Sequence, residues 1–167
     1  MIAFDRLGGD VVVKPLFGSE GRGIARLGDE ALALRAFKML AQLGAVLYVQ
    51  EFIEHEGYDL RVLIVADRLL TMRRRSEHDW RTNVSRGAAT EACELPAEMD
   101  NLARRAAAAV GAPVAGVDLL PGRDGRWHVL EVNAVPGWKA LARTLQVDVA
   151  ALVLDYLSSL VSGGRGP

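Results

Sequence analysis

The sequence predicts an α+β protein in which antiparallel sheets pack against helices. Two pairs of apolar runs predict β-hairpins: Tyr58–Val65 with Arg68–Arg75, and Val114–Leu120 with Trp127–Val132. The first pair is joined by a short Ala-Asp turn and the second by a turn rich in Gly, Pro and Asp. Apolar residues also recur at helical spacing from Pro96 to Val110 and again after Asp148.

Length and composition limit the kinds of function that this chain can have. A chain of 167 residues can bury one substantial core or form two small lobes. A formal net charge of −1 argues against nucleic acid or an anionic membrane as partner. The single cysteine, Cys93, excludes an internal disulfide, and no Cys/His cluster has zinc spacing. No apolar run has the length of a signal-peptide core or a membrane span, so we expect a cytoplasmic protein.

A glycine-rich loop follows the first predicted strand. The strand Asp10–Lys14 ends in a lysine, and the run LFGSEGRGI leads into a second strand, Ile24–Leu27. Glycines permit a close approach of backbone N–H groups to an anion. The lysine precedes the glycines and no helix follows, so the loop is not a P-loop. Two interpretations remain, an ordinary turn and an anion-binding lid centred on Ser19, Gly21 and Gly23.

The middle of the chain alternates helix and strand signals. Asp29 predicts the N-cap of a helix that packs through Ala33, Phe37 and Leu40 and ends at Gly44. The apolar run Ala45–Gln50 predicts a strand leading into Glu51 and Phe52. The run Tyr58–Val65 becomes wholly apolar, which is typical of a central strand, and Asp59 and Arg61 fall on one of its faces.

The segment Met72–Gly87 is the most basic part of the chain, with five arginines. One interpretation is a solvated loop or an RNA-binding patch through Arg73–Arg86, which the acidic residues in the run and the neutral balance of the chain disfavour. The alternative is a loop that brings arginines to phosphates, to which their planar charged groups are suited.

Two helices are predicted in the second half of the chain. The first has its core-facing positions at Met99, Leu102, Ala103, Ala106 and Val110. The second is capped by Asp148 and has one apolar face formed by Leu152, Val153, Tyr156, Leu157 and Leu160. The tail SGGRGP is expected to be disordered.

Two acids interrupt the apolar runs of the second hairpin. They are Asp118 in VDLL and Glu131 in LEVN, and a buried carboxylate needs a cation or hydrogen bonds. Glu131 and Asn133 are two residues apart and therefore share a strand face. If Asp118 lies opposite them, three oxygen ligands converge, which suits Mg²⁺. The alternative is one salt-bridged acid and a turn asparagine.

The order of these motifs resembles the RimK-like group of ATP-grasp ligases. The similarity consists of the strand-end lysine, the glycine-rich lid, QEFI, the DxR strand, RTN, and then D…ExN followed by Pro-Gly. Within the group, NAVPGWKAL is most similar to ligases that add glutamate to tetrahydromethanopterin-type cofactors. The resemblance implies an ATP-grasp fold with an incomplete N-terminal portion. It divides the chain into a partial nucleotide-binding lobe (1–50), a lobe with the metal site (51–162) and a disordered tail (163–167).

The resemblance also implies roles for particular residues. Lys14 would contact the nucleotide phosphates under a lid containing Ser19, Gly21 and Gly23. Glu51 and Phe52 would meet the adenine, and Asp59 the ribose. Arg81, Thr82 and Asn83 would lie on the phosphate side, with Arg61 and Arg74 as further catalytic candidates. Asp118, Glu131 and Asn133 would hold Mg²⁺, or alternatively Mn²⁺.

The implied reaction joins an amino acid to an acceptor carboxylate through an acyl phosphate, with conversion of ATP to ADP and phosphate. Glutamate is the expected amino acid. The acceptor would be a pterin-type cofactor or a peptide tail. A missing N-terminal domain or a homo-oligomer would complete the site. The alternative is a nucleotide-binding or scaffold module without turnover.

Overall fold

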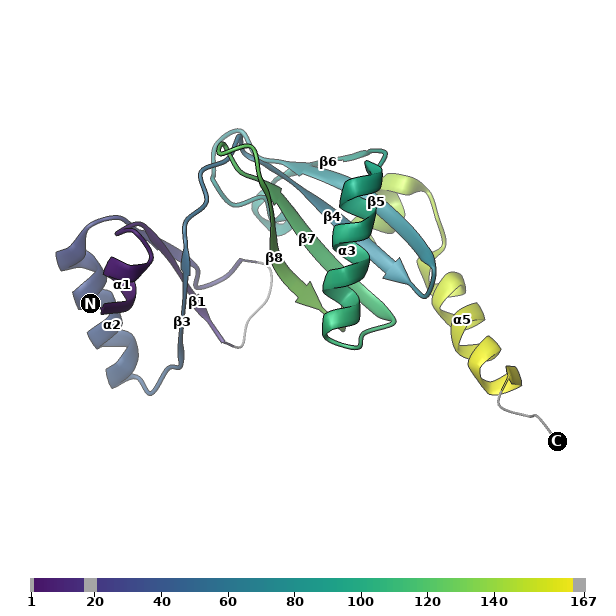
Figure 1. The fold of residues 1–167 in the computed structure, drawn as a ribbon, viewed down its shortest axis with the longest axis horizontal. Coiled ribbons are helices and arrows are strands. Elements are labelled where there is room, and N and C mark those ends of the chain that lie inside the picture. Colours follow the sequence, from purple (N-terminus) through teal and green to yellow (C-terminus); the bar gives the residue numbers. More distant parts are fainter. Residues whose placement is uncertain (1, 17–20, 164–167) are drawn as a thin grey trace. The chain divides into compact units, whose positions relative to one another are not determined.

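The protein is described by a computed structural model that covers residues 2–16 and 21–163. Its described residues form two compact units, one ending at Glu54 and the other beginning at His55 (Figure 1). Every strand pair in both units is antiparallel, which confirms the predicted α+β class. The functional roles assigned to two lobes stay predictions.

The first unit is a three-stranded sheet with two helices. Its elements are α1 (Ile2–Arg6), β1 (Val11–Pro15), β2 (Ala25–Leu27), α2 (Glu30–Gln42) and β3 (Leu47–Glu51), and the strand order is β2-β1-β3. Phe4, Val11, Val13 and Ala33 form its buried core. The backbone N–H of Leu32 donates to Asp29 Oδ1 at 2.8 Å, which confirms the predicted N-cap. The α1 helix was not predicted, because five residues show too little periodicity.

The second unit contains a five-stranded sheet of order β6-β5-β4-β7-β8. Its strands are β4 (Tyr58–Val65), β5 (Arg68–Arg75), β6 (Ala89–Ala92), β7 (Val114–Pro121) and β8 (Trp127–Asn133). Both predicted hairpins are present, and β4 is the central strand as expected. The 3₁₀ turn η1 (Val84–Arg86) falls in the segment Met72–Gly87 that was interpreted as a loop, and the short β6 follows that segment. Neither element was predicted.

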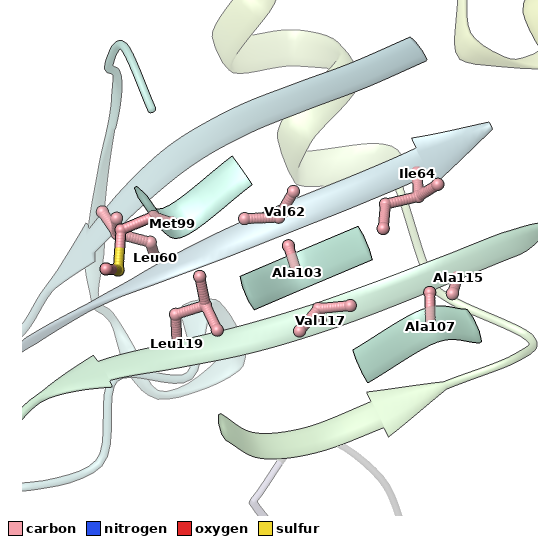
Figure 2. Close-up of a cluster of buried hydrophobic side chains, with 9 residues drawn as sticks. All are labelled: Leu60, Val62, Ile64, Met99, Ala103, Ala107, Ala115, Val117 and Leu119. Atoms are coloured by element: carbon pink, nitrogen blue, oxygen red, sulfur yellow. The ribbon is translucent and has the colours of Figure 1, made fainter. Parts of the chain in front are cut away.

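One face of this sheet packs against helix α3 (Ala97–Ala109). Alternating residues of β4 and β7 supply that face, and small residues of α3 allow a close approach, as Figure 2 shows. The buried set is Leu60, Val62, Ile64, Met99, Ala103, Ala107, Ala115, Val117 and Leu119. The prediction that Val110 faces the core is wrong, since its side chain is 59% exposed. The helix ends at Ala109, so the helical spacing no longer applies to Val110, and Ala107 occupies the core.

The other face of the sheet is apolar over one half, where helices α4 (Lys139–Leu145) and α5 (Val149–Gly163) cover it. Leu63, Val65 and Met72 of the sheet pack there against Leu141 and Val149. Asp148 caps α5 as predicted, accepting from the backbone N–H of Ala151 at 3.0 Å. The α4 helix lies in a stretch for which no helix was predicted.

The predicted core face of α5 extends too far. Leu157 and Leu160 are 48% and 54% exposed, because the later turns of α5 lead away from the sheet (Figure 1). In the described part of the chain, no single helix is long and apolar enough to cross a membrane. The α4 and α5 helices reach such length and composition only together, with a bend of 108° between them.

A β-bulge in β8 decides which side chains reach each face. Asp118 pairs with Glu131, whereas Leu119 pairs with Val129, so Leu130 is an extra residue in β8. Trp127, Val129 and Val132 pack on the α3 side. Without the extra residue, strict alternation would place Glu131 on the same face as Trp127 and Val129. The bulge therefore turns Glu131 and Asn133 to the opposite face, beside Asp118.

The Leu119→Ala variant tests the core under α3. Leu119 is completely buried, so its truncation leaves a cavity. We expect a loss of about 2–4 kcal/mol in the free energy of unfolding, measured by urea denaturation. The control is Leu154→Ala on the exposed side of α5, which should change stability by less than about 0.5 kcal/mol. Equal losses in the two variants would contradict this packing.

Candidate functional site

In the five-stranded sheet, the face that packs against α4 and α5 is apolar over one half only. The other half of this face is polar, and we call it the polar face. It consists of Asp59, Arg61, Arg74, Asp118, Glu131 and Asn133. Strand pairing brings them together, since Asp59 lies opposite Arg74, Arg61 opposite Asp118, and Asp118 opposite Glu131. The structure therefore places the three predicted metal ligands and two of the predicted catalytic arginines on one surface of the second unit.

Arg74 is clamped between two buried carboxylates. Its Nε donates to Asp59 Oδ1 at 2.7 Å, and its Nη2 donates to Asp59 Oδ2 and, at 2.8 Å, to Asp118 Oδ2. The Thr82 hydroxyl donates to Asp59 Oδ2 at 2.7 Å. Asp59 is 1% and Arg74 4% exposed, so these contacts are shielded from water. The predicted contact of Asp59 with a ribose stays a prediction, and its observed partners favour a role in holding Arg74.

Arg61 approaches Asp118 from the other side. Arg61 Nε lies 3.0 Å from Asp118 Oδ1, and both side chains are largely buried. Asp118 Oδ1 and Arg61 Nη1 are buried atoms that form no hydrogen bond within the described part of the chain. A buried carboxylate oxygen without a hydrogen bond has capacity for a further cation.

Burial shifts the ionisation of this cluster. Removal from water raises the pKa of Asp59 above its ordinary value, and the charge of Asp118 adds to this, against the opposing effect of Arg74. Burial acts to lower the pKa of Arg74, but the charges and hydrogen bonds of Asp118 and Asp59 raise it further above its ordinary value. Arg74 is therefore a permanent cation. Its side chain is buried, so it cannot form part of an RNA-binding surface.

Arg81 is held by a short loop after β5. Asp79 accepts the backbone N–H and the Nε of Arg81 at 3.0 Å each, and Arg81 Nη2 donates to Asp79 Oδ2 at 2.7 Å. Arg86 Nε adds a contact of 3.3 Å to the same carboxylate. These hydrogen bonds lower the pKa of Asp79 to about 2. The loop thus fixes the orientation of the first residue of the predicted RTN segment.

The other two residues of that segment differ in their surroundings. Thr82 is buried against Asp59 through its hydroxyl. Asn83 is partly exposed, and its carbonyl accepts the backbone N–H of Arg86 at 3.0 Å. The structure therefore joins Thr82 to the polar face, while Asn83 starts the 3₁₀ turn η1.

The remaining predicted site residues belong to the first unit. Lys14 lies in β1, with its Nζ 6.0 Å from the ring centroid of Tyr48. Gly21 and Gly23 adopt positive φ angles of 70° and 72°, which glycine favours. Ser19 lies outside the described residues. Glu51 ends β3 and is exposed, and one face of the Phe52 ring is covered by the guanidinium of Arg26, 3.5 Å from the ring centroid.

Comparison with known proteins assigns this arrangement to a family. The pattern that describes the RimK-like ATP-grasp domain matches residues 1–157. The chain belongs to the RimK-like ATP-grasp family. This confirms the resemblance found in the sequence motifs, and with it the predicted ATP-grasp fold.

Individual relatives of this RimK-like chain are ligases by name. It is 37% identical over 160 residues to the tetrahydromethanopterin:alpha-L-glutamate ligase of Methanococcus maripaludis, covering 93% of this chain and 54% of that protein. It is 35% identical over 163 residues to a probable alpha-L-glutamate ligase of Rhodopirellula baltica, covering 95% and 40%. It also matches the structure of the ATP-grasp ligase PsnB with a precursor variant, Mg and ADP. That match has a TM-score of 0.68 and 27% identity, and covers 95% of this chain and 48% of PsnB. The chain thus spans about half the length of the relatives it matches.

The residues of the polar face fit a magnesium ion. Asp118 and Glu131 are opposite one another, and Asn133 lies two residues further along β8. Asn133 Oδ1 accepts the backbone N–H of Val135 at 2.9 Å and keeps a second lone pair. Hard oxygen ligands of this kind suit Mg²⁺. Among the residues that the structure describes, no three Asp, Glu, His or Cys side chains gather as a metal group. The predicted set contains only two such acids, its third member being an amide.

Sequence reasoning missed Asp79. This carboxylate forms ion pairs with Arg81 and Arg86, and it lies in a segment that was interpreted through its arginines. The spacing of Asp79 and Arg81 was the available signal. An aspartate commonly accepts the backbone N–H two residues later, which orders a turn.

The Arg74→Met variant tests the clamp. It leaves the carboxylates of Asp59 and Asp118 buried with their main cation removed. We expect a loss of about 3–5 kcal/mol in the free energy of unfolding, measured by denaturant titration. The matched control is Arg104→Met, which removes an exposed ion pair with Asp100 and should cost about 0.5 kcal/mol. A loss below about 1 kcal/mol for Arg74→Met would contradict the clamp.

The pKa of Asp79 predicts a dependence of stability on pH. Its pKa is lowered in the folded protein to about 2, so its ion pairs stabilise the fold above the unfolded-state pKa of about 4. That contribution is lost as the pH falls from about 4 to about 2. In Asp79→Asn, we expect the melting temperature to change less over this interval than in the wild type, with Asp67→Asn as an exposed control. Parallel curves for all three proteins would contradict the assignment.

Proposed function

We propose that this chain is the ATP- and Mg²⁺-binding part of a carboxylate–amine ligase that joins an amino acid, most simply L-glutamate, to an acceptor carboxylate. The observation that carries the proposal is the polar face. Asp118, Glu131 and Asn133 share it with two arginines, which is the charge pattern needed to bind Mg²⁺ and phosphates. The alpha-L-glutamate ligases among the relatives support glutamate as the added amino acid.

The chemistry follows from this distribution of charge. The acceptor carboxylate attacks the γ-phosphorus of ATP, which gives an acyl phosphate and releases ADP. The amine of the amino acid then attacks the acyl carbon and releases phosphate. The first step brings two anions together, so the site needs fixed positive charge more than a nucleophile. When bound, Mg²⁺ neutralises phosphate oxygens and orients the transferred group.

The residues of this chain take separate roles in the proposal. Asp118, Glu131 and Asn133 hold Mg²⁺, with Mn²⁺ as an alternative. Arg61 and Arg81 face the phosphates, and Arg74 holds Asp118 in place through its hydrogen bond to Oδ2. Lys14 and the glycines of the lid bind the nucleotide phosphates, while Glu51 and Phe52 receive the adenine. The acceptor is a pterin-type cofactor or a peptide tail, each of which has a precedent among the relatives.

The second candidate function is a nucleotide-binding module without turnover. The chain spans about half the length of these relatives. A complete set of predicted metal ligands favours the ligase instead. The two functions differ in turnover and share nucleotide binding.

The ligase proposal predicts ADP release that requires ATP, Mg²⁺, glutamate and a carboxylate acceptor together. A coupled ADP assay should be run on this chain and on a version extended to the length of its relatives. Release by either protein supports the ligase. Mg²⁺-dependent nucleotide binding without release by either favours the module without turnover.

The Glu131→Ala variant tests the metal site independently of turnover. We expect Mg²⁺-dependent ADP affinity, measured by calorimetry, to fall at least about tenfold, since one oxygen ligand and one negative charge are removed. The control is Glu94→Ala, an exposed acid outside the polar face, whose affinity should equal that of the wild type. Unchanged affinity in Glu131→Ala would remove this residue from the metal site.

A further inference from the structure

We propose that Gly116 is a positioning residue for Arg61. Gly116 lies in β7, two residues before Asp118 and on the same side of the strand. Glycine inside a strand weakens it, so its presence there needs a reason. Backbone conformation does not supply one, because the φ of Gly116 lies outside the left-handed region. The reason is the space that its missing side chain leaves.

That space is occupied by two neighbours. A Cβ atom at position 116 would lie 2.8 Å from Arg61 Nη1 and 2.9 Å from Pro136 Cβ. Both distances are shorter than a carbon atom tolerates, so a side chain here must displace the guanidinium, the proline or both. The bare backbone of Gly116 thus lines the space in which the Arg61 guanidinium lies, and Pro136 also borders the position that a side chain at residue 116 would take.

The position of the Arg61 guanidinium depends on packing against Gly116, whereas that of Arg74 is set by hydrogen bonds. Arg74 is oriented by hydrogen bonds to Asp59 and Asp118 together. Arg61 has one ion pair within the described residues, to Asp118 Oδ1, and its Nη1 is buried without a hydrogen bond. Packing therefore sets the position of its guanidinium. A methyl group on residue 116 would push it away from β7 and separate it from Asp118.

The consequence for the site rests on the proposed function. Arg61 lies beside Asp118, a proposed metal ligand, so a displaced guanidinium alters the charge next to Mg²⁺ and the phosphates. We expect Gly116→Ala to weaken Mg²⁺-dependent ADP affinity by about tenfold, the size expected when two contacting residues are coupled. The melting temperature should also fall by about 5 °C.

The test is a double-mutant cycle on the whole chain. Gly116→Ala is measured alone, with Arg61→Ala and with Pro136→Gly, each by thermal unfolding without nucleotide and by calorimetry with ADP and Mg²⁺. Gly28→Ala is the matched control, since its added methyl would meet Asp10 at an ordinary 3.7 Å and its φ is also outside the left-handed region. This control should match the wild type in affinity.

The proposal expects Gly116→Ala to have little further effect on either quantity once Arg61 is alanine. An undiminished effect in the Arg61→Ala background, or relief only in the Pro136→Gly background, would overturn it. If the Gly116→Ala protein does not fold, a folded Gly116→Ala/Arg61→Ala protein supports the proposal. If neither protein folds, the proposal is overturned. A wild type that binds no Mg²⁺–ADP defeats the proposed function, while the unfolding cycle still decides the role of Gly116.

Discussion

The buried ion cluster around Arg74 is the interaction on which the polar face depends. Two carboxylates, Asp59 and Asp118, come from β4 and β7, and the guanidinium between them comes from β5. Isolated charges at this depth would be costly, so each member needs the others. The cluster also holds Asp118 by one oxygen and leaves the other beside Arg61. The result is a buried, charged base beneath the proposed metal site.

In the sheet of the second unit, the face that carries α4 and α5 has two parts. The half under α4 and α5 is an apolar core, and the other half is the polar face. On the opposite face of the sheet, apolar side chains form a buried cluster against α3. Because β4 and β7 are fixed by a core on one face, their polar side chains on the other are presented from a firm support. The proposed phosphoryl transfer would require such support, since its catalysis is mainly positioning and electrostatics.

The first unit contributes a different kind of group. Its candidates are a strand lysine, glycines with positive φ, and the strand-end pair Glu51 and Phe52. In the proposed function these groups hold the nucleotide. The chain belongs to the RimK-like ATP-grasp family and spans about half the length of the relatives it matches.

Local patterns in the sequence determined much of this description. The hairpins, the central position of β4, the caps Asp29 and Asp148, and the α3 helix all follow from residue spacing or a single capping side chain. The ordered motifs also identified the family. These features depend on neighbours in the chain, and period, turn and cap signals report such neighbours directly.

Tertiary structure decided what depends on contacts between distant residues. The pairing of Arg74 with Asp59 and Asp118 joins residues 15 and 44 positions apart, and nothing in a run of three arginines distinguishes the buried one. The bulge at Leu130 turns Glu131 and Asn133 toward Asp118, although strict alternation from Trp127 places them on the α3 side. In the sequence nothing distinguishes Gly116 from any other small residue, and only the structure shows that Arg61 packs against it. Sequence spacing determined which elements form, and packing across the sheet determined which side chains meet, because register and bulges are settled by all the strands together.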